Sequence, residues 1–328
     1  MTTAARVEVL LGEARGGSRR ALGRLLAIAE SGGDAAEALD RAILGAEPPA
    51  WIIGVVGAPG VGKSTLTGRL AAAAAGTHPG PAPHVAVIAV DPSSPLTGGA
   101  ILGDRIRMLD IGDRREVFVR SMAHRGATGG LADAVPVCVR LLGAVGVAVV
   151  ILETVGVGQI ELEIVHAADT VIAVVSTGWG DAIQASKAGL LEVADVFVVN
   201  KADRPGARDA VRDLEQMLDA GAPPHDARTA WRAPVCTTVA TAGTGIPELW
   251  TAARAHRDWL AQTGAFAGRR TERLRHEIGR RAVGILARRV AERLADDGAG
   301  GPETPEAAAQ RIAAEIAAGD PSLIAPGP

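Results

Sequence analysis

The stretch that most constrains the fold is residues 57–65, which read GAPGVGKST. It matches the pattern G-x-x-x-x-G-K-[ST] at every fixed position, after an apolar run and before an alanine-rich segment that favours a helix. Glycines in such a turn let backbone N–H groups converge on an anion, and the following helix directs its positive end to the same place. The pattern therefore predicts a phosphate-binding loop. The residues expected to form it are Gly57, Ala58, Pro59, Gly60, Val61, Gly62, Lys63, Ser64 and Thr65.

Short apolar runs alternate with helical patterns from this loop onward. Continuous apolar runs of this length are typical of parallel strands that are covered on both faces. The alternation predicts an α/β three-layer sandwich with a mainly parallel sheet, which binds ligands at the carboxyl ends of its strands. The expected strands are 51–57, 84–91, 117–121, 147–153, 170–175, 196–200 and 235–239. The expected helices between them are 63–75, 129–143, 161–167, 182–193, 206–220 and 246–262.

Helical extensions are expected on both sides of this region. The predicted organisation is an N-terminal helical extension at 1–48, a nucleotide-binding domain at 49–263 and a C-terminal helical arm at 264–328. The segment Arg269 to Leu294 carries nine arginines, three glutamates and two apolar stripes. One stripe could cover the body of the protein and the other a second copy, which predicts a dimer arm. Burial of both stripes within one chain explains the pattern equally well.

Composition excludes several classes of function. A net charge of -3 lacks the basic footprint that non-specific nucleic-acid binding requires. No run of 18 uncharged apolar residues occurs, so we expect a cytoplasmic protein without a membrane span. Cys138 and Cys236 lie in apolar stretches and are expected to be reduced core residues.

Lys63 and Ser64 have separate expected roles. The lysine would neutralise the outer phosphates, and the serine hydroxyl would ligate Mg²⁺, which prefers oxygen ligands. Asp91 and Asp104 lie in a loop rich in Gly, Ser and Pro after the second strand, where their carboxylates could reach the Mg²⁺ shell. A turn former at Asp91 and a helix N-cap at Asp104 explain these residues equally well from spacing alone.

The end of the fourth strand supplies a third carboxylate. Glu153 follows a buried run next to the expected phosphate-loop strand, and its extra methylene relative to Asp suggests that it reaches Mg²⁺ through a water. Gly156 would bring a backbone N–H to the γ-phosphate. No glutamine directly follows Gly156, and Gln159 is displaced, so we expect slow hydrolysis that a partner completes. The residues expected to take part in hydrolysis are Lys63, Glu153 and Gln159.

The sixth strand ends in an N-K-x-D motif formed by Asn200, Lys201 and Asp203. Asp203 can accept hydrogen bonds from N1–H and the 2-amino group of guanine, an edge on which adenine offers an acceptor and no amine. Asn200 would support the loop, while the Lys201 stem covers the ring. The expected ligands are therefore GTP and GDP. A backbone N–H for guanine O6 could come from Val239, Ala240 or Thr241.

Six segments together resemble the MeaB/MMAA family: residues 57–65, 91–108, 120–132, 151–161, 178–189 and 198–203. This resemblance implies a SIMIBI-type P-loop GTPase that acts as a chaperone for an adenosylcobalamin-dependent acyl-CoA mutase, chiefly methylmalonyl-CoA mutase. It also implies Mg²⁺, a homodimer, and a possible adenosyltransferase partner. A third mobile loop would couple nucleotide and mutase through Asp181, Gln184 and Lys187. The chain departs from the usual family pattern at Ile160 and at Ser176-Thr177.

Three other classes share parts of this pattern. A metallochaperone-type GTPase would need a cluster of His and Cys, which the scattered His and two Cys of this chain do not provide. A kinase for a transport protein, as in the ArgK-like name given to some bacterial members, is disfavoured by a motif that selects guanine. A signal-recognition GTPase would need a domain rich in Met or basic residues, and the chain has four Met.

Overall fold

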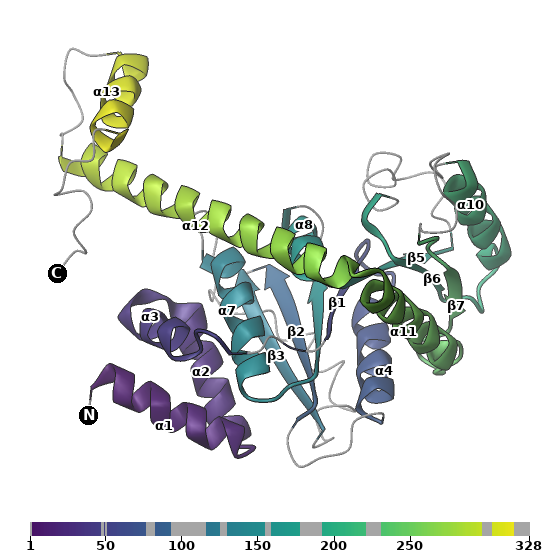
Figure 1. Cartoon of the computed structure of the whole chain (residues 1–328). Helices are drawn as coiled ribbons and strands as arrows, with labels where there is room; N and C mark the ends of the chain where they lie inside the picture. The colour runs from purple at the N-terminus through teal and green to yellow at the C-terminus, as the bar shows by residue number, and fades with distance from the viewer. Residues whose placement is uncertain are drawn as a thin grey trace. The chain divides into compact units, whose positions relative to one another are not determined.

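A seven-stranded parallel sheet with the order β3-β2-β4-β1-β5-β6-β7 forms the centre of the structure (Figure 1). The computed structural model describes residues 2–46, 49, 51–76, 83–92, 116–124, 130–154, 159–177, 192–220, 231–296 and 304–317. The strands are β1 (Trp51–Val56), β2 (Val85–Pro92), β3 (Val117–His124), β4 (Val149–Thr154), β5 (Thr170–Ser176), β6 (Val196–Asn200) and β7 (Val235–Thr238). The predicted parallel α/β fold is therefore confirmed.

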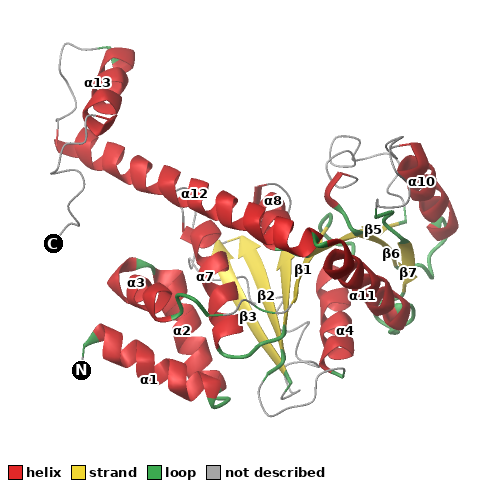
Figure 2. Ribbon diagram, viewed as in Figure 1, coloured by secondary structure: helices red, strands yellow, loops and turns green. Residues whose placement is uncertain are grey.

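Helices cover both faces of this sheet, as the ribbon in Figure 2 shows. On one face α4 (Lys63–Ala75) and α11 (Ile246–Thr263) pack on the strands, and on the other α7 (Gly130–Ala144), α8 (Gln159–Ala167) and α10 (Ala207–Ala220) do so. Successive strand residues alternate between the two cores: Ile52 belongs to one and Ile53 to the other. This alternation explains why the central strands β4, β1 and β5 read as nearly continuous apolar runs, because both of their faces are buried.

Three N-terminal helices extend one of these layers. They are α1 (Thr3–Arg15), α2 (Arg19–Ser31) and α3 (Gly33–Ala42). The side chains of Thr2 and Ser18 cap α1 and α2 by accepting backbone N–H bonds. Two ion pairs tie the layer to the sheet and to α7: Arg120 with Glu30 at 2.9 Å, and Arg140 with Asp40 at 2.6 Å.

The C-terminal part forms a second compact unit. Residues 1–274 form the first unit and residues 275–328 the second, so α12 (Ala265–Asp296) begins in one and continues into the other. The second unit also contains α13 (Pro305–Ala317), whose first turn is capped by the Thr304 hydroxyl. Within the described residues, no helix combines the length and apolar character needed to cross a bilayer. Apolar side chains exposed on α12 are Leu274, Ile278, Val283, Ile285, Leu286 and Leu294.

Candidate functional site

The phosphate loop lies at the carboxyl end of β1, where the chain turns into α4. Gly62 is the N-cap of α4, with a left-handed φ of 98°, and no side chain caps the helix. The first N–H groups of a helix have no partners within that helix, and they carry its positive dipole end. An uncapped N-terminus beneath a glycine loop is therefore suited to an anion.

Two glycines are required by the geometry of this loop. Gly57 has a φ of 139°, and a Cβ added there would lie 2.1 Å from the carbonyl oxygen of Val174 on β5. A Cβ added at Gly62 would lie 2.4 Å from Nδ2 of Asn200. Both positions combine a backbone conformation that favours glycine with a close approach to another strand. A side chain at either one would displace the loop.

Two lysines donate hydrogen bonds to backbone carbonyls of the loop. Nζ of Lys63, which is almost fully buried, donates to the carbonyl oxygens of Gly57 and, at 3.1 Å, of Ala58. Nζ of Lys201 donates to the carbonyl oxygen of Gly60. Lys201 has a φ of 58°, a conformation that costs a non-glycine residue about 1 kcal/mol and tends to occur at functional positions. Both ammonium groups therefore contact the backbone of the phosphate loop.

Ser64 and Glu153 meet at the same edge of the sheet. The Ser64 hydroxyl donates to Oε1 of Glu153 at 2.6 Å, and both side chains are buried. The contact exists because β4 pairs directly with β1, in a register that sets Val55 opposite Glu153. A hydroxyl that donates its proton keeps its lone pairs for a cation, and the carboxylate adds a charged oxygen. This donor set fits Mg²⁺.

Asn200 joins the phosphate loop to the loop after β7. Its Nδ2 donates to the carbonyl oxygen of Val61 at 2.8 Å. Its Oδ1 accepts from the Thr238 hydroxyl at 3.0 Å and from the backbone N–H of Ala240 at 3.1 Å. With its side chain buried, Asn200 uses both ends of its amide to hold together two loops that are far apart in the sequence.

The expected guanine-reading residues lie around this amide. Asp203 is exposed in the loop after β6. Of the three candidate backbone donors, the N–H of Val239 donates to the Thr244 carbonyl at 3.0 Å and that of Ala240 to Asn200. The remaining candidate is Thr241, which is exposed. The recognition of guanine O6 therefore stays a prediction.

Several expected residues are described in part or lie outside the described residues. Asp91 falls within β2 and Gln159 begins α8, but the side chains of both lie outside the description. Their predicted roles at Mg²⁺ and in hydrolysis stay predictions. Outside the described residues lie Asp104, Gly156, Asp181, Gln184 and Lys187.

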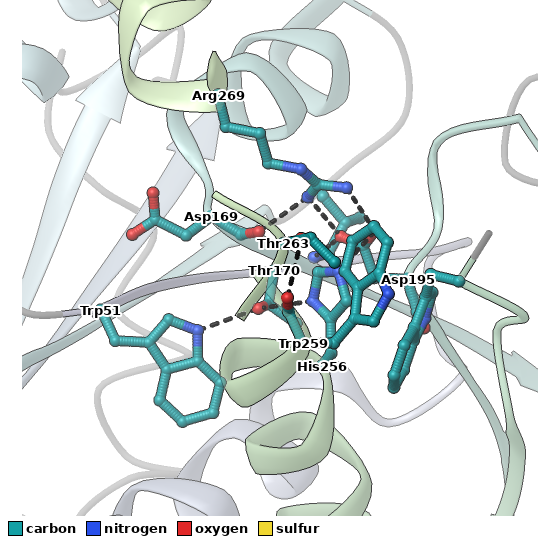
Figure 3. Close-up of polar contacts among 10 residues, drawn as sticks. Trp51, Asp169, Thr170, Asp195, His256, Trp259, Thr263 and Arg269 are labelled. Carbon is teal, nitrogen blue, oxygen red and sulfur yellow. Dashed lines mark hydrogen bonds and ion pairs between the residues drawn. The ribbon is translucent and has the colours of Figure 1, made fainter. Parts of the chain in front are cut away.

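A second polar cluster lies at the opposite, amino-terminal edge of the sheet (Figure 3). His256 of α11 faces Oδ1 of Asp195 through Nε2 at 3.2 Å and Oγ1 of Thr170 through Nδ1 at 2.9 Å. The indole N–H of Trp51 donates to Oγ1 of Thr170 at 2.9 Å, so the Thr170 hydroxyl proton is available to His256 Nδ1. The order carboxylate, imidazole, hydroxyl is that of a nucleophilic relay.

Burial excludes catalysis by this cluster. The side chains of Thr170 and His256 are fully buried, so no substrate can reach the hydroxyl. Burial lowers the pKa of His256 to about 4, with a further lowering by Arg269, while the Asp195 carboxylate opposes the shift. The imidazole is therefore neutral near pH 7. The cluster is structural.

Two arginines at the start of α12 complete this cluster. Arg269 donates from Nη2 to Oδ1 of Asp195 at 2.6 Å and from Nη1 to Oδ2 at 2.7 Å. Arg273 pairs with Asp169, whose other carboxylate oxygen accepts the backbone N–H of Ile52 at 2.9 Å. Charged groups on α12 thus meet acids at the starts of β5 and β6. Isolated Asp and Arg residues carry no pattern, so these contacts could not be predicted from the sequence.

Arg69 of α4 also makes contacts that no sequence pattern indicates. Its guanidinium donates to the carbonyl oxygens of Ala240 and Thr241 in the loop after β7. No motif connects Arg69 with Ala240 and Thr241, which lie 171 and 172 positions after it in the sequence. The contact is visible only in the folded chain.

Comparison with known proteins identifies the family. The model for "Methylmalonyl Co-A mutase-associated GTPase MeaB" matches residues 22–295. A Pyrococcus abyssi protein named as a GTPase is 40% identical over 87% of this chain and 86% of its own length. The GTPase ArgK of Escherichia coli is 35% identical over 72% of this chain and 71% of its own length. A fused isobutyryl-CoA mutase of Paraburkholderia xenovorans is 36% identical over 51% of this chain and 13% of its own length.

A solved structure agrees with the fold. The crystal structure of a LAO/AO transport system kinase superposes with a TM-score of 0.68 at 24% identity, and the match covers 95% of this chain and 98% of the other. At this identity the likeness concerns the fold alone. The family match, together with the close relatives, shows that the chain belongs to the MeaB family of GTPases associated with methylmalonyl-CoA mutase.

Proposed function

We propose that this chain binds GTP and GDP with Mg²⁺ at the carboxyl edge of its sheet, hydrolyses GTP slowly, and couples the bound nucleotide to an adenosylcobalamin-dependent acyl-CoA mutase. In this proposal it protects the mutase and gates the loading or exchange of its cofactor. The family name supports the association with a mutase. The fused isobutyryl-CoA mutase also supports it, because that protein contains a segment similar to this chain.

The observation that carries the nucleotide site is the pair of contacts made by Asn200. Its amide binds the phosphate loop at Val61 and the loop after β7 at Ala240. These contacts support the proposal that the phosphate-binding and base-binding motifs are parts of one site. A single ligand with a triphosphate at one end and a guanine at the other fits this arrangement.

The residues of the phosphate loop have distinct roles in the proposal. Lys63 exchanges the carbonyl oxygens of Gly57 and Ala58 for phosphate oxygens, and the uncapped N-terminus of α4 supplies backbone donors. When Mg²⁺ is bound, it neutralises charge on the phosphates. Ser64 and Glu153 would hold it, with Asp91 and Asp104 as further candidates, and Glu153 orients the serine hydroxyl.

Guanine selection is assigned to the second motif. Asp203 accepts from N1–H and the 2-amino group, and the Lys201 stem covers the ring. With adenine in the site, the carboxylate would face an acceptor at N1 and lose both hydrogen bonds, so the site would reject it. The exposed position of Asp203 leaves its carboxylate accessible to a ligand.

Hydrolysis is expected to be slow without a partner. Gln159 begins α8, and the glycine segment before it lies outside the described residues. We propose that the mutase raises the rate by ordering residues 178–187, in which Asp181, Gln184 and Lys187 carry the coupling. An adenosyltransferase is a further candidate partner. The exposed apolar side chains of α12 support a homodimer, because single chains seldom leave such a stripe uncovered.

The proposal is tested by measuring GTP hydrolysis with and without methylmalonyl-CoA mutase and isobutyryl-CoA mutase. At least one mutase should accelerate hydrolysis by the wild-type chain, and Lys187→Ala should reduce that acceleration while leaving the basal rate unchanged. A matched control is Arg254→Ala, which removes an exposed cation on α11. Equal rates with and without both mutases would refute the coupling, and calorimetry showing no preference for GTP over ATP would refute the nucleotide assignment.

A further inference from the structure

The peptide that joins Ala240 and Thr241 is fixed by a side chain outside both nucleotide-binding motifs. Arg69 on α4 donates from Nε to the Ala240 carbonyl oxygen at 3.2 Å and from Nη2 to the Thr241 carbonyl oxygen at 2.9 Å. Five donors in a planar fork allow one guanidinium to bind two neighbouring carbonyls in a fixed geometry. Arg69 therefore sets the direction of two consecutive peptide groups.

Peptide planarity carries this effect to a backbone donor. In a trans peptide the carbonyl and the N–H of the next residue lie in one plane and point in opposite directions. When Arg69 holds the Ala240 carbonyl toward α4, the N–H of Thr241 points away from α4 within the same plane. The preceding N–H, that of Ala240, is held by Asn200 at 3.1 Å. The loop after β7 is thus fixed from two directions.

The two holding residues come from different parts of the chain. Asn200 comes from the N-K-x-D motif, while Arg69 lies six residues after Lys63 on the helix that begins at the phosphate loop. A shift of α4 relative to β7 would change the direction of the backbone donors in this loop. The position of the phosphate helix and the geometry of the base loop are therefore linked through one side chain.

We propose that Arg69 is a positioning residue for guanine recognition: it holds the loop at residues 239–241 so that the backbone N–H of Thr241 faces O6 of the base. This inference rests on the proposed guanine nucleotide site and adds a specificity determinant to it. Nε and Nη2 of Arg69 donate to protein carbonyls, so in this proposal Arg69 acts on the base through the loop and not by direct contact.

The proposal predicts a loss of affinity that depends on the base. Arg69→Ala should weaken the affinity for GTP and the affinity for ITP about tenfold each. This is the range expected for losing hydrogen bonds from a charged but partly exposed donor. ITP keeps O6 and lacks the 2-amino group that Asp203 reads, so the ratio of GTP to ITP affinity should not change. Inorganic tripolyphosphate with Mg²⁺ has no base, and its affinity should stay within about twofold of wild type.

Isothermal titration calorimetry on the full chain separates the possible outcomes. Arg69→Met keeps the aliphatic stem and removes only the donors, so it should reproduce the Ala result and replaces that variant if it fails to fold. Arg254→Ala, on α11, is the control. Wild-type GTP affinity in the Met variant, or an equal loss for tripolyphosphate, overturns the role of Arg69. If the wild-type chain itself shows no preference for GTP over ATP, the proposed nucleotide site fails instead.

Discussion

The two edges of the sheet treat their polar groups in different ways. At the amino-terminal edge, the charged side chains pair with one another: Asp195 binds Arg269 and faces His256, and Asp169 binds Arg273. At the carboxyl edge, the ammonium groups of Lys63 and Lys201 rest on backbone carbonyl oxygens. Such oxygens are neutral acceptors that a phosphate can replace.

This difference separates stability from ligand binding. Buried charges that pair only with each other lose a partner when one is removed, and the remaining charge destabilises the fold. Charges held by backbone carbonyls can be removed with less harm, because no unpaired charge is left behind. We therefore expect substitutions at the amino-terminal edge to lower stability, and those at the carboxyl edge to lower nucleotide binding or turnover.

The largest effect is expected for Asp195→Ala. The substitution leaves the Arg269 guanidinium and the backbone N–H of Val171 without their carboxylate acceptor. The free energy of unfolding should fall by about 3 to 5 kcal/mol, or roughly 10 °C in Tm. Thermal unfolding measures this loss, and GTP affinity measured well below Tm should be unchanged. The control is Asp209→Ala, which breaks an exposed pair with Arg212 and should cost less than about 1 kcal/mol.

Lys63→Ala tests the other edge and should show the reverse pattern. GTP hydrolysis should fall by about a hundred- to a thousandfold, because the ammonium neutralises charge on the phosphates in the transition state. The Tm should change by only a few degrees, since the lysine donates to carbonyls of its own loop. Single-turnover hydrolysis and thermal unfolding would be compared. A large loss of stability would break the contrast between the edges.

Asp203→Asn should change which base is bound. The amide cannot accept from guanine as the carboxylate does, so GTP affinity should fall by roughly a hundredfold. Xanthosine triphosphate has an oxygen at C2 that the new amide can bind, and its affinity should rise. Fluorescence competition with both nucleotides measures this change in base preference. Unchanged GTP binding would mean that the base lies elsewhere, and Asp209→Asn provides a surface control.

The smallest effect concerns pH and belongs to His256. Its pKa is about 4 in the folded chain and 6.5 in the unfolded reference, so the unfolded state binds more protons between these values. The group therefore contributes stability that is present above about pH 6.5 and is lost as pH falls toward 4. We expect a loss of about 2 kcal/mol from about pH 7 to about pH 4.5.

His256→Gln isolates this contribution, because it removes the titrating group while keeping polar atoms. Denaturant unfolding at each pH would show a shallower loss of stability for the variant than for the wild-type chain. Parallel curves would assign the acid sensitivity to other groups. Nucleotide affinity at the carboxyl edge should not follow this titration, because His256 lies at the opposite edge of a parallel sheet.

Much of the fold could be predicted from local pattern. The strand ending at Val56, the glycine loop and the helix from Lys63 occur where the phosphate-loop pattern indicates, because glycine spacing and apolar runs act within a few residues. The sequence predicts an acid at the end of the strand beside the phosphate loop, but it does not predict the contact between Glu153 and Ser64. Its length of 2.6 Å depends on the pairing of β1 with β4, which only the fold provides.

The sequence by itself determined the phosphate loop, the base motif and the parallel α/β architecture, because each depends on residue types at fixed short spacing. The tertiary structure decided how Asn200 and Arg69 hold one loop from two sides, and how His256 comes to lie between Thr170 and Asp195. Those contacts join residues that are up to 172 positions apart. Burial and direction arise only when strands and helices pack, so no local pattern could have revealed them.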